Sequence, residues 1–338
     1  MVEVSKFGDK TIVIDSRYIS IFKAGKLLKK VAYMPYELPD GNRYKYRRPI
    51  IIIERSGKDL TNYQVKIEIV GDDPIWGHAR SDGADIRFCY YEEEQMLNYW
   101  IEKYDPTNKE AIIWVKVPSI PANSKTIIFM YYGNREVASA SDGEATFDFF
   151  DDFNTKDTDK WIWNNADVKD GYAYTTADGG SLLSVSKPIR KDMDFMLRTR
   201  MWLAQDYDID YRLYYDNSNY ILVRQSTWRE SPYVGKTQWK KIVGGSENIL
   251  TYGFGPDVVL NEWFSHRMTR IGTNYEVWCR RDSTGEEGTA KASITDSVFV
   301  NNDLQIMLSG RHANDRWDYV IVGKYTYPEP LVCVCLEE

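Results

Sequence analysis

The feature that most constrains the fold is an apolar side chain at every second residue, repeated in short segments. In residues 193–202, for example, Phe195 and Leu197 share one side of an extended strand, and Arg198 lies on the other. Such segments alternate with clusters of Gly, Pro, Asn and Asp, which favour tight turns. No long stretch keeps the period of an amphipathic helix. The sequence therefore predicts an all-β protein of antiparallel strands.

Length and strand grouping divide the chain into an arm and two domains, because 338 residues exceed what one hydrophobic core usually fills. We expect a short β-hairpin arm for anchoring or assembly at residues 1–47. A β-sandwich at 48–140 and a second, jelly-roll-like β-sandwich at 141–338 follow it. The strands expected in these sandwiches are 49–54, 63–70, 86–90, 98–103, 111–117, 126–132, 193–202, 210–215, 220–225, 239–243, 263–270, 275–280, 304–309 and 317–325.

Charge and hydropathy exclude several partners. The net charge is -7 and no long basic run occurs, so we expect no binding to nucleic acid. No window approaches the run of about 20 apolar residues that a membrane helix needs. The first residues lack the basic start and apolar stretch of a Sec signal peptide. If the protein works on a virion or an extracellular surface, we expect it to arrive there without a Sec signal in this chain, for example as part of a virus particle.

Several ordered segments of the first sandwich carry a resemblance to a known family. They are Tyr46–Ile50, Leu60–Val65, Ser81–Phe88, Tyr99–Glu102, Ile113–Ala122 and Tyr131–Asn134. In this order they resemble the domain-of-unknown-function 2341 family of archaeal, bacterial and viral surface proteins. The resemblance implies a fold and a surface setting, but no catalytic residues.

The second sandwich carries its own resemblance. The segments Phe149–Phe153, Asp170–Tyr172 and Trp317–Tyr325, together with Trp161, are similar to the opening and close of a concanavalin A-like lectin or laminin-G-like jelly roll. Such a module often follows members of the family above. The resemblance implies a lectin-like fold for the second domain.

Aromatic residues make up 14% of the chain, with 25 Tyr and 11 Trp, more than a core of this size requires. Flat aromatic faces stack on sugar rings, and neighbouring polar side chains bond to hydroxyl groups. We therefore predict a glycan- or receptor-binding face on the second domain. Its candidate residues are Trp202, Tyr207, Asp208, Asp210, Tyr211, Tyr215, Asn217, Trp228 and Arg229. For any single aromatic residue, packing in the core is the alternative.

Catalytic patterns are scarce. The paired carboxylates of glycoside hydrolases in E-x-D-x-E spacing do not occur, nor do a nucleophile elbow, a P-loop or a dinucleotide fingerprint. The nearest acidic pair is Asp208 and Asp210, at alternate positions of one expected strand. We therefore expect a non-enzymatic structural or adhesion protein.

Two other functions remain open. One is a purely architectural subunit of a capsid, tail or filament, whose partners are other copies of itself and neighbouring virion or surface proteins. The other is a polysaccharide-degrading glycoside hydrolase that uses Asp208 and Asp210.

Calcium is the one cofactor that the sequence suggests. The candidate ligands are Asp152, Asn154 and Asp157, because clustered oxygen atoms on a turn suit this cation. The segment departs from the EF-hand loop, which needs a Gly at the position of Asp157 and a Glu at that of Trp163. A solvated turn is the alternative.

Overall fold

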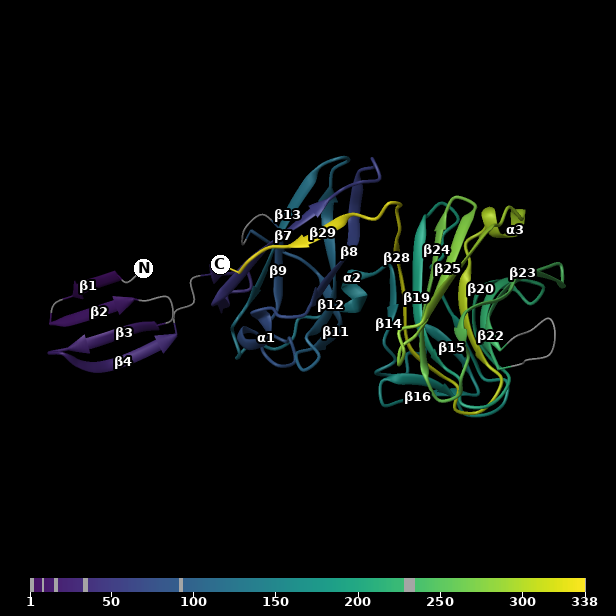
Figure 1. Cartoon of the computed structure of the whole chain (residues 1–338), viewed down its shortest axis with the longest axis horizontal. Helices are drawn as coiled ribbons and strands as arrows, with labels where there is room; N and C mark the ends of the chain where they lie inside the picture. Colours follow the sequence, from purple (N-terminus) through teal and green to yellow (C-terminus); the bar gives the residue numbers. More distant parts are fainter. Residues whose placement is uncertain are drawn as a thin grey trace. The chain divides into compact units, whose positions relative to one another are not determined.

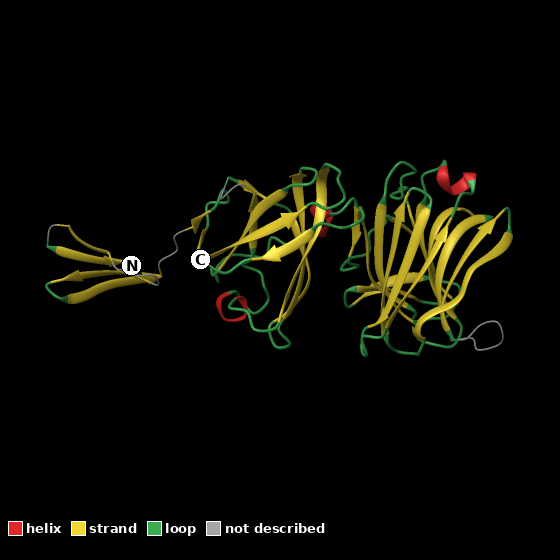
Figure 2. Cartoon of the chain, turned by 45° about the horizontal axis from the view of Figure 1, so that its top comes forward, coloured by secondary structure: helices red, strands yellow, loops and turns green. Residues whose placement is uncertain are grey.

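The structure is a computed structural model that describes residues 3–7, 9–14, 18–32, 36–90, 94–227 and 235–337. Its regular structure is almost entirely strand (Figure 2). The helices of the described residues are single turns, α1 (Ile75–His78), α2 (Gly143–Thr146) and α3 (Ser297–Val300). Within these residues, no helix is long and apolar enough to cross a membrane. The predicted all-β class is confirmed.

The chain forms two compact units, residues 1–146 with 328–338, and residues 147–327. This division differs from the predicted second domain at 141–338. The last strand, β29 (Leu331–Val334), pairs with β7 (Tyr46–Ile53), beside which it lies in Figure 1. Residues 328–338 therefore complete the first unit, and the second unit is an insertion between two segments of the first.

The predicted arm contains a four-stranded antiparallel sheet in the order β1-β2-β3-β4. Its strands are β1 (Glu3–Phe7), β2 (Lys10–Ile14), β3 (Tyr18–Lys23) and β4 (Lys26–Ala32). The side chains of Val4, Leu27 and Leu28 are exposed. A short hairpin of β5 (Tyr36–Glu37) and β6 (Arg43–Tyr44) follows.

The first sandwich is made of a five-stranded and a three-stranded sheet. The larger has the order β10-β9-β13-β7-β29 and the smaller the order β11-β12-β8. Their remaining strands are β8 (Leu60–Val70), β9 (Arg87–Tyr90), β10 (Gln95–Met96), β11 (Tyr99–Asp105), β12 (Glu110–Ile120) and β13 (Lys125–Tyr132). Aliphatic side chains at alternate positions, such as Ile50, Ile67 and Ile113, fill the space between the sheets.

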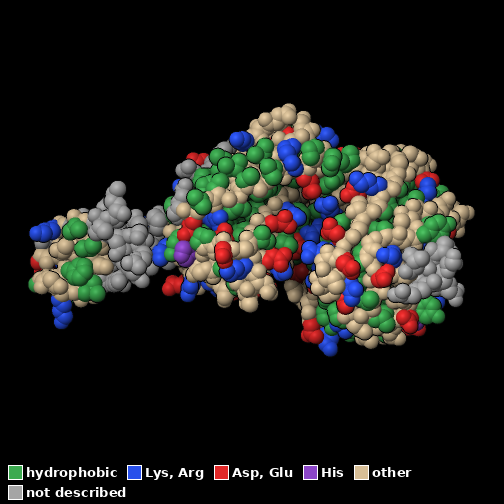
Figure 3. Space-filling model, viewed as in Figure 1, with side chains coloured by type: hydrophobic (Ala, Val, Ile, Leu, Met, Phe, Trp, Pro, Cys, Tyr) green, Lys and Arg blue, Asp and Glu red, His purple; other side chains and the backbone are tan. Residues whose placement is uncertain are grey.

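The outer face of the five-stranded sheet is apolar at one end. In Figure 3, hydrophobic side chains gather over β7, β13 and β29. The register places Ile51 between Ile127 of β13 and Cys333 of β29, and Ile53 beside Leu331. Ile127 and Leu331 are 46% and 44% exposed. We call these five residues the apolar face.

The second unit is a larger, jelly-roll-like sandwich. One sheet has the order β16-β17-β28-β19-β24-β25-β26, with β14 also paired to β28, and the other the order β15-β18-β27-β20-β21-β22-β23. The strands are β14 (Phe149–Asp151), β15 (Trp161–Asn164), β16 (Ala166–Lys169), β17 (Tyr172–Thr175), β18 (Ser181–Ser184), β19 (Phe195–Trp202), β20 (Asp208–Asp216), β21 (Asn219–Ser226), β22 (Lys236–Val243), β23 (Ser246–Asp257), β24 (Trp263–Ile271), β25 (Asn274–Arg281), β26 (Glu287–Ser293), β27 (Gln305–Gly310) and β28 (Arg316–Lys324). Trp161, Trp239 and Trp317 are fully buried between the sheets, so part of the aromatic excess fills this core.

Candidate functional site

The strongest candidate site lies on the outward face of the seven-stranded sheet, on β20 and β21. The pleat of β20 turns Asp208, Asp210 and Arg212 outward, because the intervening Ile209 and Tyr211 face the core. The register places Arg224 of β21 opposite Asp210. Two carboxylates and two guanidinium groups therefore meet on adjacent strands.

These four side chains form one ion-pair network. Arg212 binds Asp210 with two nitrogen atoms, with N–O distances of 2.6 and 3.1 Å. Arg224 bridges the two acids, at 2.9 Å from Asp208 and 3.5 Å from Asp210. Asp210 is only 2% exposed, so the loss of either arginine would leave a buried carboxylate short of a partner. The network therefore fixes the positions of Asp208 and Arg224.

Two buried atoms of this network have unused hydrogen-bonding capacity. Asp208 Oδ1, an acceptor, and Arg224 Nε, a donor, are buried and have no hydrogen-bond partner. Buried polar atoms nearly always have one. A hydroxyl group can donate to the carboxylate and accept from the guanidinium at the same time. The pair is therefore suited to a ligand that carries hydroxyl groups.

An exposed aromatic ring adjoins the network. Tyr207 precedes Asp208, is 47% exposed and has a φ of 100°, which is rare for a residue with a side chain. Its ring lies 5.4 Å from that of His312 and 5.3 Å from the guanidinium of Arg311. The Arg311 amide donates to the Asp208 carbonyl at 3.0 Å, which ties this loop to β20. Tyr207 therefore offers an exposed flat ring at the residue that precedes Asp208 in the chain.

A buried carboxylate supports the loop from behind. Asp315 accepts hydrogen bonds from the amides of His312 and Ala204, at 3.1 and 3.0 Å. Burial raises the pKa of Asp315 to about 6, against the lowering effect of these amides. Asp315 therefore holds the backbone of His312 beside Tyr207.

The structure separates several of the predicted glycan-binding residues. Tyr211 is fully buried and Tyr215 packs against the core, because odd-numbered residues of β20 point inward. Trp202 belongs to the other sheet, where it packs against Trp263. Asn217, in the turn after β20, accepts the Tyr214 hydroxyl at 2.7 Å. None of these four residues joins the Asp208–Arg224 pair.

Trp228 and Arg229 lie outside the described residues. Of the predicted set, Tyr207, Asp208 and Asp210 are therefore the residues that the structure brings together.

Sequence reasoning missed both arginines of the network. Arg212 stands two positions after Asp210, so the alternation that pairs the two acids also places Arg212 on their face. Arg224 carries no such signal. Its place opposite Asp210 depends on the register between β20 and β21, which the turn and the packed faces set together.

The predicted calcium ligands are engaged in local hydrogen bonds. The Asn154 amide group donates to Asp152 at 2.6 Å, and Asp157 accepts from the amides of Asp159 and Lys160. Over the part of the chain that the structure describes, no three His, Cys, Asp or Glu side chains are grouped to hold a metal ion. The calcium site stays a prediction, and the local bonding is that of a capped turn.

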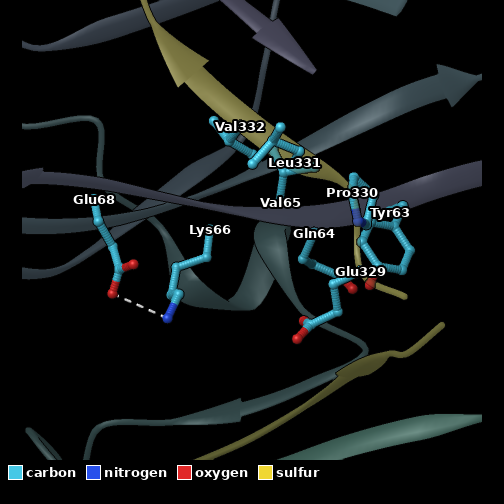
Figure 4. A pocket seen from close by; sticks show the side chains of 9 residues that line it. All are labelled: Tyr63, Gln64, Val65, Lys66, Glu68, Glu329, Pro330, Leu331 and Val332. Atoms are coloured by element: carbon cyan, nitrogen blue, oxygen red, sulfur yellow. Dashed lines mark ion pairs between the residues drawn. The ribbon is translucent and has the colours of Figure 1, made fainter. Parts of the chain in front are cut away.

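A groove on the first unit is a second candidate. It has a volume of about 320 Å³ and lies between the edge strands β8 and β29 (Figure 4). Its walls carry Tyr63, Leu331 and the ion pair of Lys66 with Glu68, whose charged atoms are 3.0 Å apart. No buried side-chain polar atom without a partner lies in the described residues of the first unit. The site on β20 and β21 therefore has the stronger claim to a ligand.

Two stacked antiparallel sheets define each unit as a β-sandwich. A comparison with protein families found a match for part of the chain. Residues 82–166 match the family described as "Domain of unknown function (DUF2341)", which confirms that resemblance over this segment. The segment runs from β9 in the first unit to β16 in the second. No curated protein matches the chain in sequence.

Solved structures similar to about half of the chain include lectin II from Ulex europaeus, at 14% identity and a TM-score of 0.39 over 52% of this chain and 97% of that one. The CBM2 module of the Lactobacillus casei BL23 phage J-1 evolved Dit has 12% identity and a TM-score of 0.38, over 52% of this chain and 94% of that one. A Bacillus licheniformis beta-glucanase has 13% identity and a TM-score of 0.37, over 52% and 98%.

Proposed function

We propose that the second unit binds a glycan through Tyr207, Asp208 and Arg224, without cleaving it. The observation that carries the proposal is the buried pair of unpartnered atoms, Asp208 Oδ1 and Arg224 Nε. A sugar hydroxyl supplies both missing hydrogen bonds, and the Tyr207 ring supplies a stacking surface. The protein then serves as an adhesion component of a virion or extracellular surface, the setting that the family resemblance implies.

Binding suits this site better than hydrolysis does. A glycoside hydrolase needs one carboxyl group that carries a proton and a second carboxylate across the sugar ring. Here Asp208 and Asp210 share one strand face, and both are ion-paired with Arg224. We therefore expect the purified protein to release no sugar from a broad panel of polysaccharides.

A glycan array, followed by titration calorimetry on each hit, tests the binding proposal. We expect Asp208→Asn to weaken binding about tenfold or more, because a hydrogen bond to a charged group contributes about 1.5–3 kcal/mol. Asp167→Asn is the matched control, since Asp167 is also ion-paired but lies on β16 of the other sheet. Equal affinity of Asp208→Asn and the wild type, or no glycan binding by the wild type, would contradict the proposal.

The apolar face of the first unit favours a second role, assembly with other copies of the chain. Monomeric proteins rarely leave a continuous apolar area on a sheet uncovered. Ile127, Ile51 and Cys333 form such a row across three adjacent strands. This role is compatible with glycan binding, because the two surfaces lie on different units.

Analytical ultracentrifugation over a range of concentrations tests the assembly role. We expect the wild type to associate and Ile127→Lys to shift it to monomer, because a charge at this position would be buried in the contact. Val70→Lys is the control, since Val70 is an exposed apolar residue on β8 and does not belong to the apolar face. A wild type that stays monomeric throughout would rule this role out.

A further inference from the structure

The outer face of the eight-stranded sheet, which contains β19 and β28, carries a row of aromatic and arginine side chains. Tyr174 of β17 pairs with Arg316 of β28, which pairs in turn with Trp202 of β19. Trp202 pairs with Trp263 of β24. Directly paired residues lie on the same side of a sheet. That side is the outer one, because Met201, which precedes Trp202, faces the core.

Two rings hold the guanidinium group of Arg316. Its Cζ atom lies 4.8 Å from the ring centre of Tyr172 and 5.2 Å from that of Trp202. A guanidinium that lies over a ring makes contact with its flat side, so the N–H groups in its plane stay free to donate. Over the residues that the structure describes, the Arg316 side chain takes part in no ion pair or hydrogen bond. Arg316 is therefore a positioned cation that no carboxylate of these residues neutralises.

A second arginine on the same face differs from Arg316 in this respect. Arg200 lies one outward position back along β19, and its guanidinium is over the Trp263 ring at 5.0 Å. It is ion-paired with Asp282, at 2.9 Å, and with Asp318. One arginine of this face is therefore neutralised within the fold, whereas the other keeps its charge for a ligand.

The surroundings of Arg316 indicate the class of ligand. Tyr172, Trp202 and Arg316 are each half-buried, so part of each side chain reaches solvent. A planar carboxylate can accept two parallel N–H groups from a guanidinium, and aromatic faces beside it stack on sugar rings. The ion pairs of Arg200 border the row, so it lacks the continuous apolar surface of a protein–protein contact. A sugar that carries a carboxylate fits these features.

We propose that Arg316, Trp202 and Tyr172 form a second sugar site on the second unit, one that takes an acidic sugar. The sugar carboxylate pairs with Arg316, and the sugar ring stacks on Trp202. This site goes beyond the proposed one at Asp208, which lies on the other sheet and takes hydroxyl groups. Trp202 is a residue that the sequence suggested for sugar binding, and the proposal gives it that role on a different surface.

Titration calorimetry of the full chain with oligogalacturonate, oligomannuronate and sialyllactose tests the proposal. We expect at least one of them to bind, and its methyl ester, which keeps the sugar ring without the charge, to bind about tenfold or more weakly. Oligoglutamate, which has carboxylates but no sugar ring, should also bind about tenfold or more weakly. If no acidic sugar binds, or if the ester or oligoglutamate binds as tightly, the proposal is overturned.

Variants locate the binding. We expect Arg316→Gln and Trp202→Leu each to weaken acidic-sugar binding about tenfold or more, with thermal unfolding as the check that both variants fold. Arg190→Gln is the matched control, because it makes the same change of charge just before β19, whereas Trp202 ends that strand. A folded Arg316→Gln variant that binds the acidic sugar as tightly as the wild type would overturn the proposal. Uncharged glycans that bind through Asp208 should bind Arg316→Gln unchanged, so the two sites are tested separately.

Discussion

A chain that ends at Tyr327 is expected to melt in its first unit about 10 °C or more below the full chain, while the second unit melts unchanged. The truncation removes β29, whose Val332 and Val334 pack against the core of the first unit. It also removes the Cys335 carbonyl, which the buried Arg48 guanidinium binds at 2.7 and 2.9 Å. The lost burial and charged hydrogen bonds together contribute about 4 kcal/mol.

Differential scanning calorimetry of both chains separates the two transitions. A synthetic peptide of residues 328–338 should restore the first one, because β29 binds β7 through backbone hydrogen bonds that a separate strand can form. A peptide with Asp in place of Val332 and Val334 is the control and should not restore it. An unchanged first transition in the truncated chain would show that β29 contributes little to the first unit.

The second unit is expected to lose stability as the pH falls from about 6.5 towards 3, because His266 is fully buried and burial lowers its pKa to about 3. The unfolded chain takes up this proton near pH 6.5, whereas the folded unit resists it down to pH 3. The loss amounts to at most about 5 kcal/mol for this single residue.

Asp315 acts in the opposite direction. Its pKa of about 6 is above the ordinary value of 3.8, so protonation stabilises the folded unit as the pH falls from 6 to about 4. This gain of at most about 3 kcal/mol offsets part of the loss from His266.

Urea unfolding of wild type and His266→Leu at pH 7, 5 and 4 isolates the histidine, because Asp315 contributes equally to both proteins. The wild type should lose stability relative to the variant at each step towards acid. Parallel curves for the two proteins would contradict the assignment of acid sensitivity to His266.

The alternation of apolar and polar residues was sufficient to predict the strands that pack one continuous apolar face against the core. The expected strand at 263–270 corresponds to β24, and that at 111–117 lies within β12. It failed for β23, where Gly253, Gly255 and Pro256 interrupt the pattern. Three register shifts between β22 and β23 accompany these residues, so this strand never shows a simple alternation.

Pairing between strands that are far apart in the sequence was the second feature that the sequence could not predict. Nothing near Leu331 in the sequence indicates that β29 joins β7, because such pairing depends on the folded body between them. The same limit applies to the candidate site. Alternation correctly placed Asp208 and Asp210 on one face, but the cross-strand position of Arg224 follows only from the register. Alternation also places Tyr211 on the opposite face from Asp210, together with Ile209 and Leu213, so the prediction of Tyr211 as a binding residue overlooked this signal.

The insertion of one unit within the other has a consequence for synthesis on the ribosome. Domains generally fold as they emerge, yet the first unit stays without its closing strand until the whole second unit has been translated. During that interval β7 presents an unpaired edge, the kind of backbone that recruits strands from other nascent chains. The first sandwich therefore starts to fold early in synthesis but is completed last. We expect protection by chaperones during that interval to govern the yield of folded protein in cells.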